Sequence, residues 1–151
     1  MIDSDIPFRG LLSIILRSHR VFVARELSSL KLTDAQVACL FRIHRQPGVT
    51  QDELSWFFQV DKGTIARITR RLEERGLIMR KQDPQNRRRY MLSLTAQGEE
   101  LIPLIRKVED RWTDLLFENL TDEERDTLME MCRRLAEDAM KIRGVEDDRG
   151  R

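Results

Sequence analysis

Hydrophobic side chains recur at the three- and four-residue spacing of an α-helix along most of this 151-residue chain. The pattern predicts six helices, over residues 6–30, 33–48, 50–58, 61–76, 95–119 and 121–142. The apolar stripe of the first helix is wide, with Leu11, Leu12, Ile15 and Leu16 close together. That helix is therefore expected to bury more than one side.

Polar residues indicate where several of these helices begin and end. Thr50 followed by Glu53 has the spacing of a capping box, in which each side chain accepts a hydrogen bond from the other residue's backbone N–H. Asp61 is expected to cap the fourth helix. Gly76 stands where the end of a helix favours a positive φ angle.

Two short segments, 77–82 and 89–94, differ from the rest because apolar and polar residues alternate in them. Asp83, Pro84 and Asn86 lie between them and predict a turn, so the two segments predict a β-hairpin. The expected fold class is mainly α with this small hairpin. Two short helices followed by a hairpin form a winged helix-turn-helix, in which the hairpin is the wing.

Charge is distributed unevenly, although the net charge is only +1. Residues 62–89 hold ten Lys/Arg against three Asp/Glu, a local excess of seven positive charges. Residues 109–151 hold eight Lys/Arg against fourteen Asp/Glu, an excess of six negative charges. A local basic zone of this kind is typical of a nucleic-acid surface.

The helix predicted over 61–75 has two different sides. Ile65, Ile68 and Leu72 lie on one side and are expected to pack on the preceding helix. The other side carries small and basic residues: Lys62, Gly63, Thr64, Arg67, Arg70 and Arg71. Such a helix fits the major groove of DNA, where side chains reach base edges. The alternative is a solvated face on which Glu73 and Glu74 pair with these arginines.

Three consecutive arginines, Arg87, Arg88 and Arg89, follow the turn, and Asp83 is the only acidic residue of the segment 83–89. An arginine at the tip of a wing can enter the minor groove, where A·T-rich sequence concentrates negative potential. Helix 61–75 in the major groove and wing 83–89 in the minor groove together predict binding to double-stranded DNA.

The wing segment resembles that of the MarR family (multiple antibiotic resistance regulators), and the resemblance extends over essentially the whole chain. The family pattern is Asp-Pro-x-Asp-Arg-Arg, followed by strand residues and Leu-Thr-x-x-Gly. The matching residues here are Asp83, Pro84, Gln85, Asn86, Arg87, Arg88, Leu94, Thr95 and Gly98.

The resemblance assigns the minor-groove role to Arg88. The family's aspartate two residues earlier, which orients that arginine, is Asn86 in this chain. Only a neutral hydrogen bond is then available in place of a charge-assisted one. Asp83 is a candidate to take over the orienting role.

The resemblance also implies one MarR-type domain over residues 1–151, working as a homodimer on a pseudo-palindromic operator. The winged helix-turn-helix lobe would span 33–95, and a helical dimerisation lobe would combine 6–30 with 96–142, leaving a polar tail over 143–151. Apolar side chains in the first and last two helices exceed what one small lobe needs: Leu11, Ile15, Leu115, Leu116, Phe117, Leu120, Leu128, Met131 and Leu135.

Members of the family often act as repressors released by a small phenolic or aromatic carboxylate. Cationic residues of the first helix and two neighbouring aromatic rings are the candidates for such a site: Arg17, His19, Arg20, Phe57 and Phe58. A cation beside aromatic rings suits an anionic aromatic ligand. The alternatives are core packing for the two phenylalanines and salt bridges for the two arginines.

Other chemistry has little support in the sequence. Cys39 and Cys132 lack metal-ligand spacing and are expected to be buried structural thiols, and His19 and His44 lie far apart, so no metal site or cofactor is expected. Motifs of nucleotide-binding and hydrolytic enzymes are missing, which predicts a protein without enzymatic activity.

The chain shows neither a signal peptide nor an apolar run of about 20 residues. The expectation is therefore a cytoplasmic protein that does not bind membranes. The alternative function is a winged-helix protein–protein interaction module of a transcription complex, without sequence-specific readout of DNA.

Overall fold

A computed structural model describes residues 3–142 of the chain. The chain divides into two compact units, Met1–Trp112 and Thr113–Arg151, and the fifth helix crosses from one to the other. The polar tail predicted over 143–151 lies outside the described residues.

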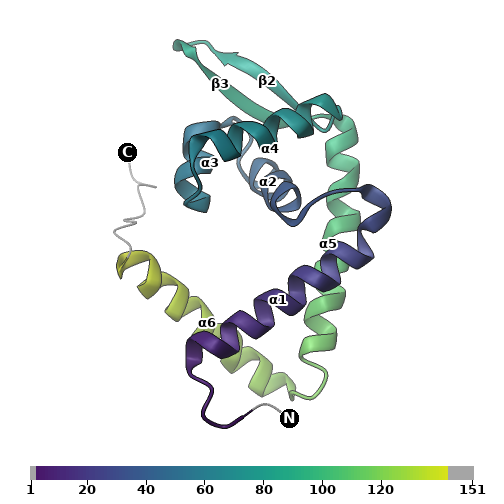
Figure 1. The fold of residues 1–151 in the computed structure, drawn as a ribbon, viewed down its shortest axis with the longest axis vertical. Coiled ribbons are helices and arrows are strands. Elements are labelled where there is room, and N and C mark those ends of the chain that lie inside the picture. The colour runs from purple at the N-terminus through teal and green to yellow at the C-terminus, as the bar shows by residue number, and fades with distance from the viewer. Residues whose placement is uncertain (1–2, 143–151) are drawn as a thin grey trace. The chain divides into compact units, whose positions relative to one another are not determined.

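All six predicted helices are present in the described part of the chain (Figure 1). Their bounds are α1 Phe8–Glu26, α2 Asp34–Arg45, α3 Gln51–Phe58, α4 Lys62–Glu74, α5 Ala96–Leu116 and α6 Asp122–Ile142. The first helix is shorter than predicted, because α1 ends at Glu26 and a 3-10 helix follows at Ser28–Leu30. Serine side chains compete with helical hydrogen bonds, which favours the change at Ser28 and Ser29.

Side chains cap the beginnings of α2, α3 and α4, whereas α1 has no side-chain cap. The Thr50–Glu53 capping box is complete at the start of α3. Gly76 has a φ angle of 69°. A second capping box, formed by Thr33 and Gln36 at the start of α2, was not predicted.

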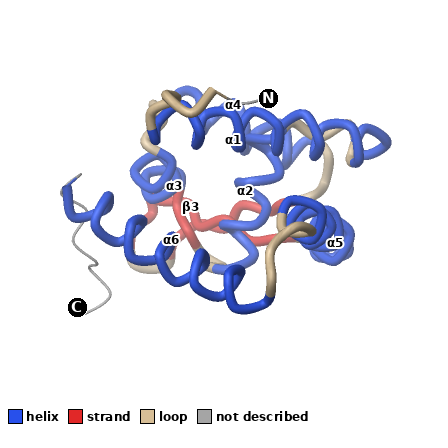
Figure 2. The backbone as a smooth tube through the Cα atoms, turned by 90° about the horizontal axis from the view of Figure 1, so that it is seen from below, coloured by secondary structure: helices blue, strands red, loops and turns tan. Residues whose placement is uncertain are grey.

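The sheet has three antiparallel strands, one more than predicted (Figure 2). β2 (Ile78–Asp83) and β3 (Asn86–Leu94) form the hairpin, and β1 (Val49–Thr50) pairs with the other side of β3. β1 escaped prediction because two residues between a Pro-Gly turn and a helix cap are too few to show alternation.

The hairpin turn is tighter than the sequence indicates. Asp83 pairs with Asn86, so only Pro84 and Gln85 connect the strands. The Asp83 Oδ1 atom accepts a hydrogen bond from the Gln85 backbone N–H at 2.8 Å. β3 therefore begins at Asn86, and the three arginines belong to the strand beside the turn.

A single apolar core joins the helices to the sheet in the first unit. Its fully buried side chains include Leu40, Leu54, Ile65, Leu72 and Leu92. These five side chains come from four elements, with one each from α2, α3 and β3 and two from α4, so the core fixes the position of α4 beside the hairpin.

The beginning of α5 lies directly against the beginning of the hairpin. A Cβ atom placed on Gly98 would approach the backbone oxygen of Leu77 to 2.1 Å. The Thr95 backbone N–H donates to the same oxygen at 3.1 Å. Only a glycine allows this close approach between helix and strand.

Polar and aromatic contacts hold α1 beside the part of α5 that belongs to the first unit. The Nε2 atom of His19 lies 2.7 Å from the Glu109 carboxylate. The rings of Phe22 and Trp112 lie 5.4 Å apart. The boundary between the compact units therefore lies within α5, after Trp112, and does not coincide with the boundaries of the predicted lobes. The division into a DNA-binding lobe and a dimerisation lobe remains a prediction.

The two cysteines have different surroundings. Cys39 is buried in α2 as predicted, and burial raises the pKa of its thiol to about 12. Cys132 on α6 is exposed, so the prediction that it is buried is wrong for this chain. None of the α6 side chains is buried by the described residues.

Candidate nucleic-acid interface

α3 and α4 form a helix-turn-helix whose connection is held by backbone and side-chain bonds. Gln59, which follows α3, adopts a left-handed φ angle of 54°. The Ser55 hydroxyl donates to the Val60 carbonyl oxygen at 2.5 Å. These contacts end α3 and direct the chain into α4.

The cap at the start of α4 is bidentate. Asp61 accepts hydrogen bonds from the Thr64 hydroxyl at 2.7 Å and from the Thr64 backbone N–H at 2.9 Å. The hydroxyl bond is the main cause that lowers the pKa of Asp61, followed by the backbone bond. Arg67 in turn donates to the Thr64 hydroxyl oxygen at 2.7 Å.

The two sides of α4 differ as predicted. Ile65 and Leu72 are buried, Ile68 is partly buried, and Thr69 is also buried. The residues predicted to contact DNA reach the surface; all are exposed except Thr64, which is half-buried: Lys62, Gly63, Thr64, Arg67, Arg70 and Arg71.

Some of the exposed cations of α4 have carboxylate partners. Lys62 lies 2.8 Å from Asp52, and Arg70 lies 2.9 Å from Glu74 one helical turn away. Within residues 3–142, no ion pair involves Arg71. The alternative prediction, a solvated face on which carboxylates pair with the arginines, thus describes only part of the helix. Exposed ion pairs of this kind contribute little stability.

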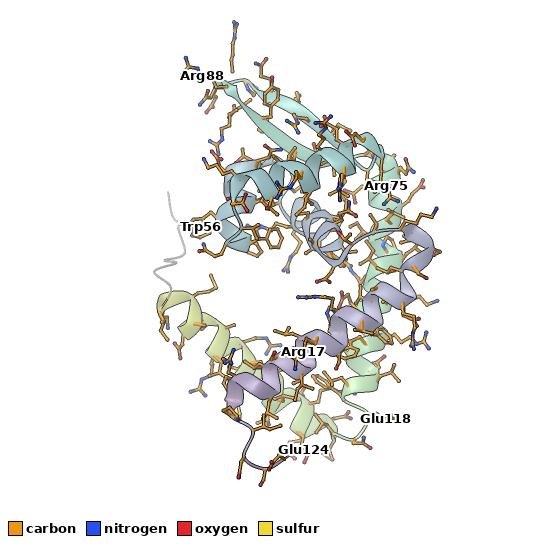
Figure 3. The ribbon with its side chains drawn as sticks, in the orientation of Figure 1. Arg17, Trp56, Arg75, Arg88, Glu118 and Glu124 are labelled. Atoms are coloured by element: carbon orange, nitrogen blue, oxygen red, sulfur yellow. The ribbon has the colours of Figure 1, made fainter. Side chains whose placement is uncertain are left out.

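The wing arginines are arranged in two ways. Arg88 lies at the outer end of the hairpin (Figure 3). Its backbone N–H donates to the Asn86 side-chain oxygen at 3.1 Å. Arg89 instead lies 3.6 Å from Glu53 of α3, a pairing that the sequence did not indicate.

The suggested substitute for the wing aspartate is engaged elsewhere. The Asp83 carboxylate accepts from the Gln85 backbone N–H and shapes the turn. Within the described range, no hydrogen bond or ion pair joins Asp83 to the Arg88 guanidinium. The structure therefore does not support Asp83 as the group that orients Arg88.

The residues predicted for an effector site do not form one cluster. His19 contacts Glu109, and Arg20 lies 3.5 Å from Asp34. The rings of Phe57 and Phe58 lie edge to face, 5.0 Å apart. A surface hollow of about 410 Å³ on α1 and α5 includes Arg17 but neither Phe57 nor Phe58. Its lining is Arg17, Ser18, Val21, Phe22, Arg25 and Trp112.

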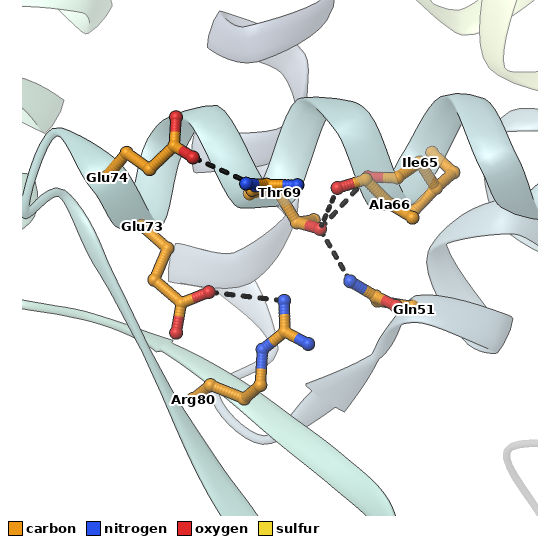
Figure 4. Close-up of polar contacts among 8 residues, drawn as sticks. Gln51, Ile65, Ala66, Thr69, Glu73, Glu74 and Arg80 are labelled. Carbon is orange, nitrogen blue, oxygen red and sulfur yellow. Dashed lines mark hydrogen bonds and ion pairs between the residues drawn. The ribbon is translucent and has the colours of Figure 1, made fainter.

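Sequence reasoning missed a set of polar contacts that join α4 to α3 and to the hairpin (Figure 4). Gln51 donates to the buried Thr69 hydroxyl at 2.6 Å. Arg80 of β2 lies 3.2 Å from Glu73 of α4. The alternation of β2 could have placed Arg80 on the core side of the sheet, but no local pattern pairs it with Glu73.

Among residues 3–142, no group of three or more His, Cys, Asp or Glu side chains is placed to hold a metal ion. No helix within this range is both long enough and apolar enough to cross a membrane.

A capped helix with an exposed basic side, packed beside a protruding basic hairpin, defines a winged helix-turn-helix protein. The chain belongs to the MarR family, whose sequence profile matches residues 32–90. It is 33% identical over 110 residues to the uncharacterized HTH-type transcriptional regulator YybA of Bacillus subtilis (strain 168), covering 73% of each chain.

Solved structures agree with this assignment. The chain is 67% identical to one crystal structure of MarR, with a TM-score of 0.90 and coverage of 95% of this chain and 98% of that one. The fold also matches that of an S. aureus MepR–DNA complex at 24% identity, with a TM-score of 0.77 and coverage of 89% and 99%. The protein is a DNA-binding transcriptional regulator of a family that does not comprise enzymes.

Proposed function

We propose that this regulator acts as a homodimer that reads one double-stranded operator, with α4 in the major groove and the 83–89 wing in the minor groove. The observation that carries the proposal is the position of the exposed basic side of α4 beside the Arg88 wing tip. A helix and a wing that enter neighbouring grooves can combine base readout with minor-groove electrostatics.

The contact residues we propose are those on the exposed side of α4 and at the wing. Arg67 is positioned to read bases, since the Asp61–Thr64 cap holds its side chain. Arg88 is the candidate for minor-groove insertion. The remaining candidates are Lys62, Gly63, Thr64, Arg70, Arg71, Arg87 and Arg89, of which Arg89 has its guanidinium turned toward Glu53.

Exposed apolar side chains support the homodimer. On α1, Leu16 is 63% exposed and Val21 is 70% exposed. Leu115, Leu128, Met131 and Leu135 of α5 and α6 are also exposed. Apolar helix surfaces of this extent are typical of obligate dimers. Two-fold symmetry then favours operator half-sites about one helical turn, ~10 bp, apart.

Repression with release by a small aromatic anion is the regulation we propose. The hollow on α1 and α5 brings two guanidinium groups, Arg17 and Arg25, beside the rings of Phe22 and Trp112. This composition suits an anionic aromatic ligand. The effector-site residues predicted from the sequence suit one less well, because Phe57 and Phe58 do not lie in the same hollow as Arg17. A ligand that prefers one arrangement of the dimer would lower DNA affinity by shifting the population.

The test of the proposed function is selection of bound sequences from a random double-stranded DNA pool at about physiological salt. We expect enrichment of a pseudo-palindrome with half-sites about one turn, ~10 bp, apart. Weak, salt-sensitive binding without enrichment would instead favour the protein–protein interaction module.

A further inference from the structure

A hollow of about 490 Å³ lies between α4, the start of α3 and the hairpin. Its lining contains two arginines, a glutamine and a tyrosine, with one carboxylate and a small residue: Gln51, Ala66, Arg70, Glu73, Arg80 and Tyr90. Four of these six residues carry side-chain hydrogen-bond donors, of which only Arg70 was among the predicted DNA contacts.

The sheet explains why Arg80 and Tyr90 belong to this hollow. Arg80 pairs across the hairpin with Leu92, and Gln82 pairs with Tyr90. Opposed residues, and residues two apart in a strand, lie on the same face of a sheet. Leu92 is fully buried. The face that covers the core therefore continues outward into Arg80 and Tyr90 beside α4.

Each arginine of the hollow is held by a carboxylate of α4. Arg80 lies 3.2 Å from Glu73 (Figure 4), and Arg70 lies 2.9 Å from Glu74. The Arg80 side chain is 29% exposed, and its guanidinium also lies 5.7 Å from the centre of the Tyr90 ring. Solvent-accessible pairs of this kind are weak and can exchange partners.

Gln51 is fixed at the edge of the hollow. Its side-chain nitrogen donates to the Thr69 hydroxyl oxygen at 2.6 Å, and Thr69 donates to the Ile65 carbonyl oxygen at 3.0 Å. The amide nitrogen has a second proton that this bond does not use. Tyr90, which is 45% exposed, also lines the hollow, and its hydroxyl is a further possible donor.

The proposed binding mode would bring a phosphate strand of DNA to this hollow. One sugar–phosphate strand separates the major groove from the neighbouring minor groove. If α4 lies in one groove and the wing in the other, the surface between them faces that strand. Contacts to phosphate oxygens fix the register of a protein on the duplex.

We propose that the hollow between α4 and the hairpin is a seat for a backbone phosphate of DNA, bound by Arg80 and Arg70 with Gln51 and Tyr90 as further donors. Glu73 and Glu74 hold the two guanidinium groups until phosphate replaces them. The seat rests on the proposed function, because it requires α4 and the wing to straddle one strand.

If the hollow binds phosphate, substitutions of the two partners of the Arg80–Glu73 ion pair should change DNA affinity in opposite directions. Arg80→Gln removes a phosphate ligand and should weaken DNA binding. Glu73→Gln removes the competing carboxylate and its repulsion of phosphate, so it should strengthen binding. If the pair only clamped the hairpin to α4, both substitutions would weaken binding.

The experiment measures the Kd of the full-length protein for its selected operator and for a random duplex of equal length over a series of salt concentrations. For Arg80→Gln we expect a loss of roughly tenfold on both duplexes, and a salt slope smaller by about one unit. Glu73→Gln should bind roughly threefold more tightly, since it removes a like charge near the phosphate.

Two further variants are the controls. Lys81→Gln removes the same charge from the neighbouring residue of β2, on the opposite face of the strand, and should change the slope less than Arg80→Gln. Arg80→Lys keeps the charge and should retain the wild-type slope. Thermal unfolding of each variant establishes that it is folded under the binding conditions.

The possible outcomes distinguish a failure of the phosphate-site proposal from a failure of the proposed function. Weaker binding by Glu73→Gln, or an unchanged slope for Arg80→Gln, would overturn the seat while the wild type still selects its operator. Failure of the wild type to select any operator would overturn sequence-specific readout. The slopes on random duplex would still decide whether Arg80 binds phosphate.

Discussion

Arg88 and Arg89 are neighbours in the sequence but have different surroundings. The Arg88 side chain extends from the outer end of the hairpin, whereas Arg89 pairs with Glu53 at 3.6 Å. A guanidinium that already has a carboxylate partner loses that pairing if it turns to DNA. Substitutions at these two neighbouring positions therefore test the proposal that Arg88 enters the minor groove.

Arg88→Ala should weaken operator binding by roughly tenfold and lower the salt slope by about one unit, because one arginine no longer displaces counterions. Arg89→Ala is the matched control and should change the slope less. Fluorescence anisotropy at several salt concentrations measures both. Equal slopes for wild type and Arg88→Ala would exclude insertion of this residue.

The cap of α4 should make the stability of the protein depend on pH. Because hydrogen bonds from Thr64 lower the pKa of Asp61, its stabilising effect is present above the ordinary carboxyl pKa of about 3.9 and is lost as the pH falls through the lower folded value. Asp61→Asn removes this dependence while an amide still caps the helix.

We therefore expect wild type to exceed Asp61→Asn in Tm above about pH 4, with the gap closing on further acidification. Thermal unfolding followed by circular dichroism from neutral to acid pH measures the gap. A difference in Tm that stays constant over this range would contradict a charged cap.

At the level of single residues, the sequence predicted the exposed side of α4 because its burial follows helical periodicity. Lys62, Arg67 and Arg70 required no tertiary information. The pairs Gln51–Thr69, Glu73–Arg80 and Glu53–Arg89 did require it. Each joins two elements, and periodicity within one element does not specify which side chain of another element lies opposite.

At the level of elements, the helices were predictable because their caps and apolar stripes agree. β1 was not, and its two residues add a strand only because β3 presents a free edge beside them. The exposed Cys132 was also mispredicted. Its helix carries apolar residues at regular spacing, but the described residues of the chain do not bury them.

The contact between α5 and the hairpin has a direct test. Gly98→Ala should lower the free energy of unfolding by about 3 kcal/mol, because overpacking forces backbone to move and a Cβ atom would meet the Leu77 oxygen at 2.1 Å. Gly63→Ala is the control, since the nearest atom to its added Cβ is a side-chain oxygen of Asp61 at 3.1 Å and not a backbone atom. Urea unfolding measures both, and equal stabilities would contradict the close approach.

At the level of the whole molecule, two exposed apolar side chains, one on each kind of surface, test the proposed dimer interface. Leu135 on α6 is 52% exposed, and Met79 on β2 is 48% exposed. If α6 contributes to the dimer, Leu135→Glu should raise the dimer dissociation constant by at least about tenfold, because a buried carboxylate is costly.

Met79→Glu introduces the same charge at a similarly exposed apolar residue outside the proposed interface, so it should leave the dimer unchanged. Sedimentation velocity over a range of protein concentrations measures both variants. A wild-type protein that sediments as a monomer at micromolar concentration would refute the proposed dimer directly.

The close contact at Gly98 also has a mechanical consequence. α5 has 21 residues and is held against the hairpin near one end, and at 1.5 Å per residue it is about 30 Å long. A tilt of about five degrees about the Gly98 contact would displace one end relative to the other by ~2.5 Å over that length. A small angular change at this joint is thus amplified by the length of α5 into a displacement of a few ångströms at the other end of the helix.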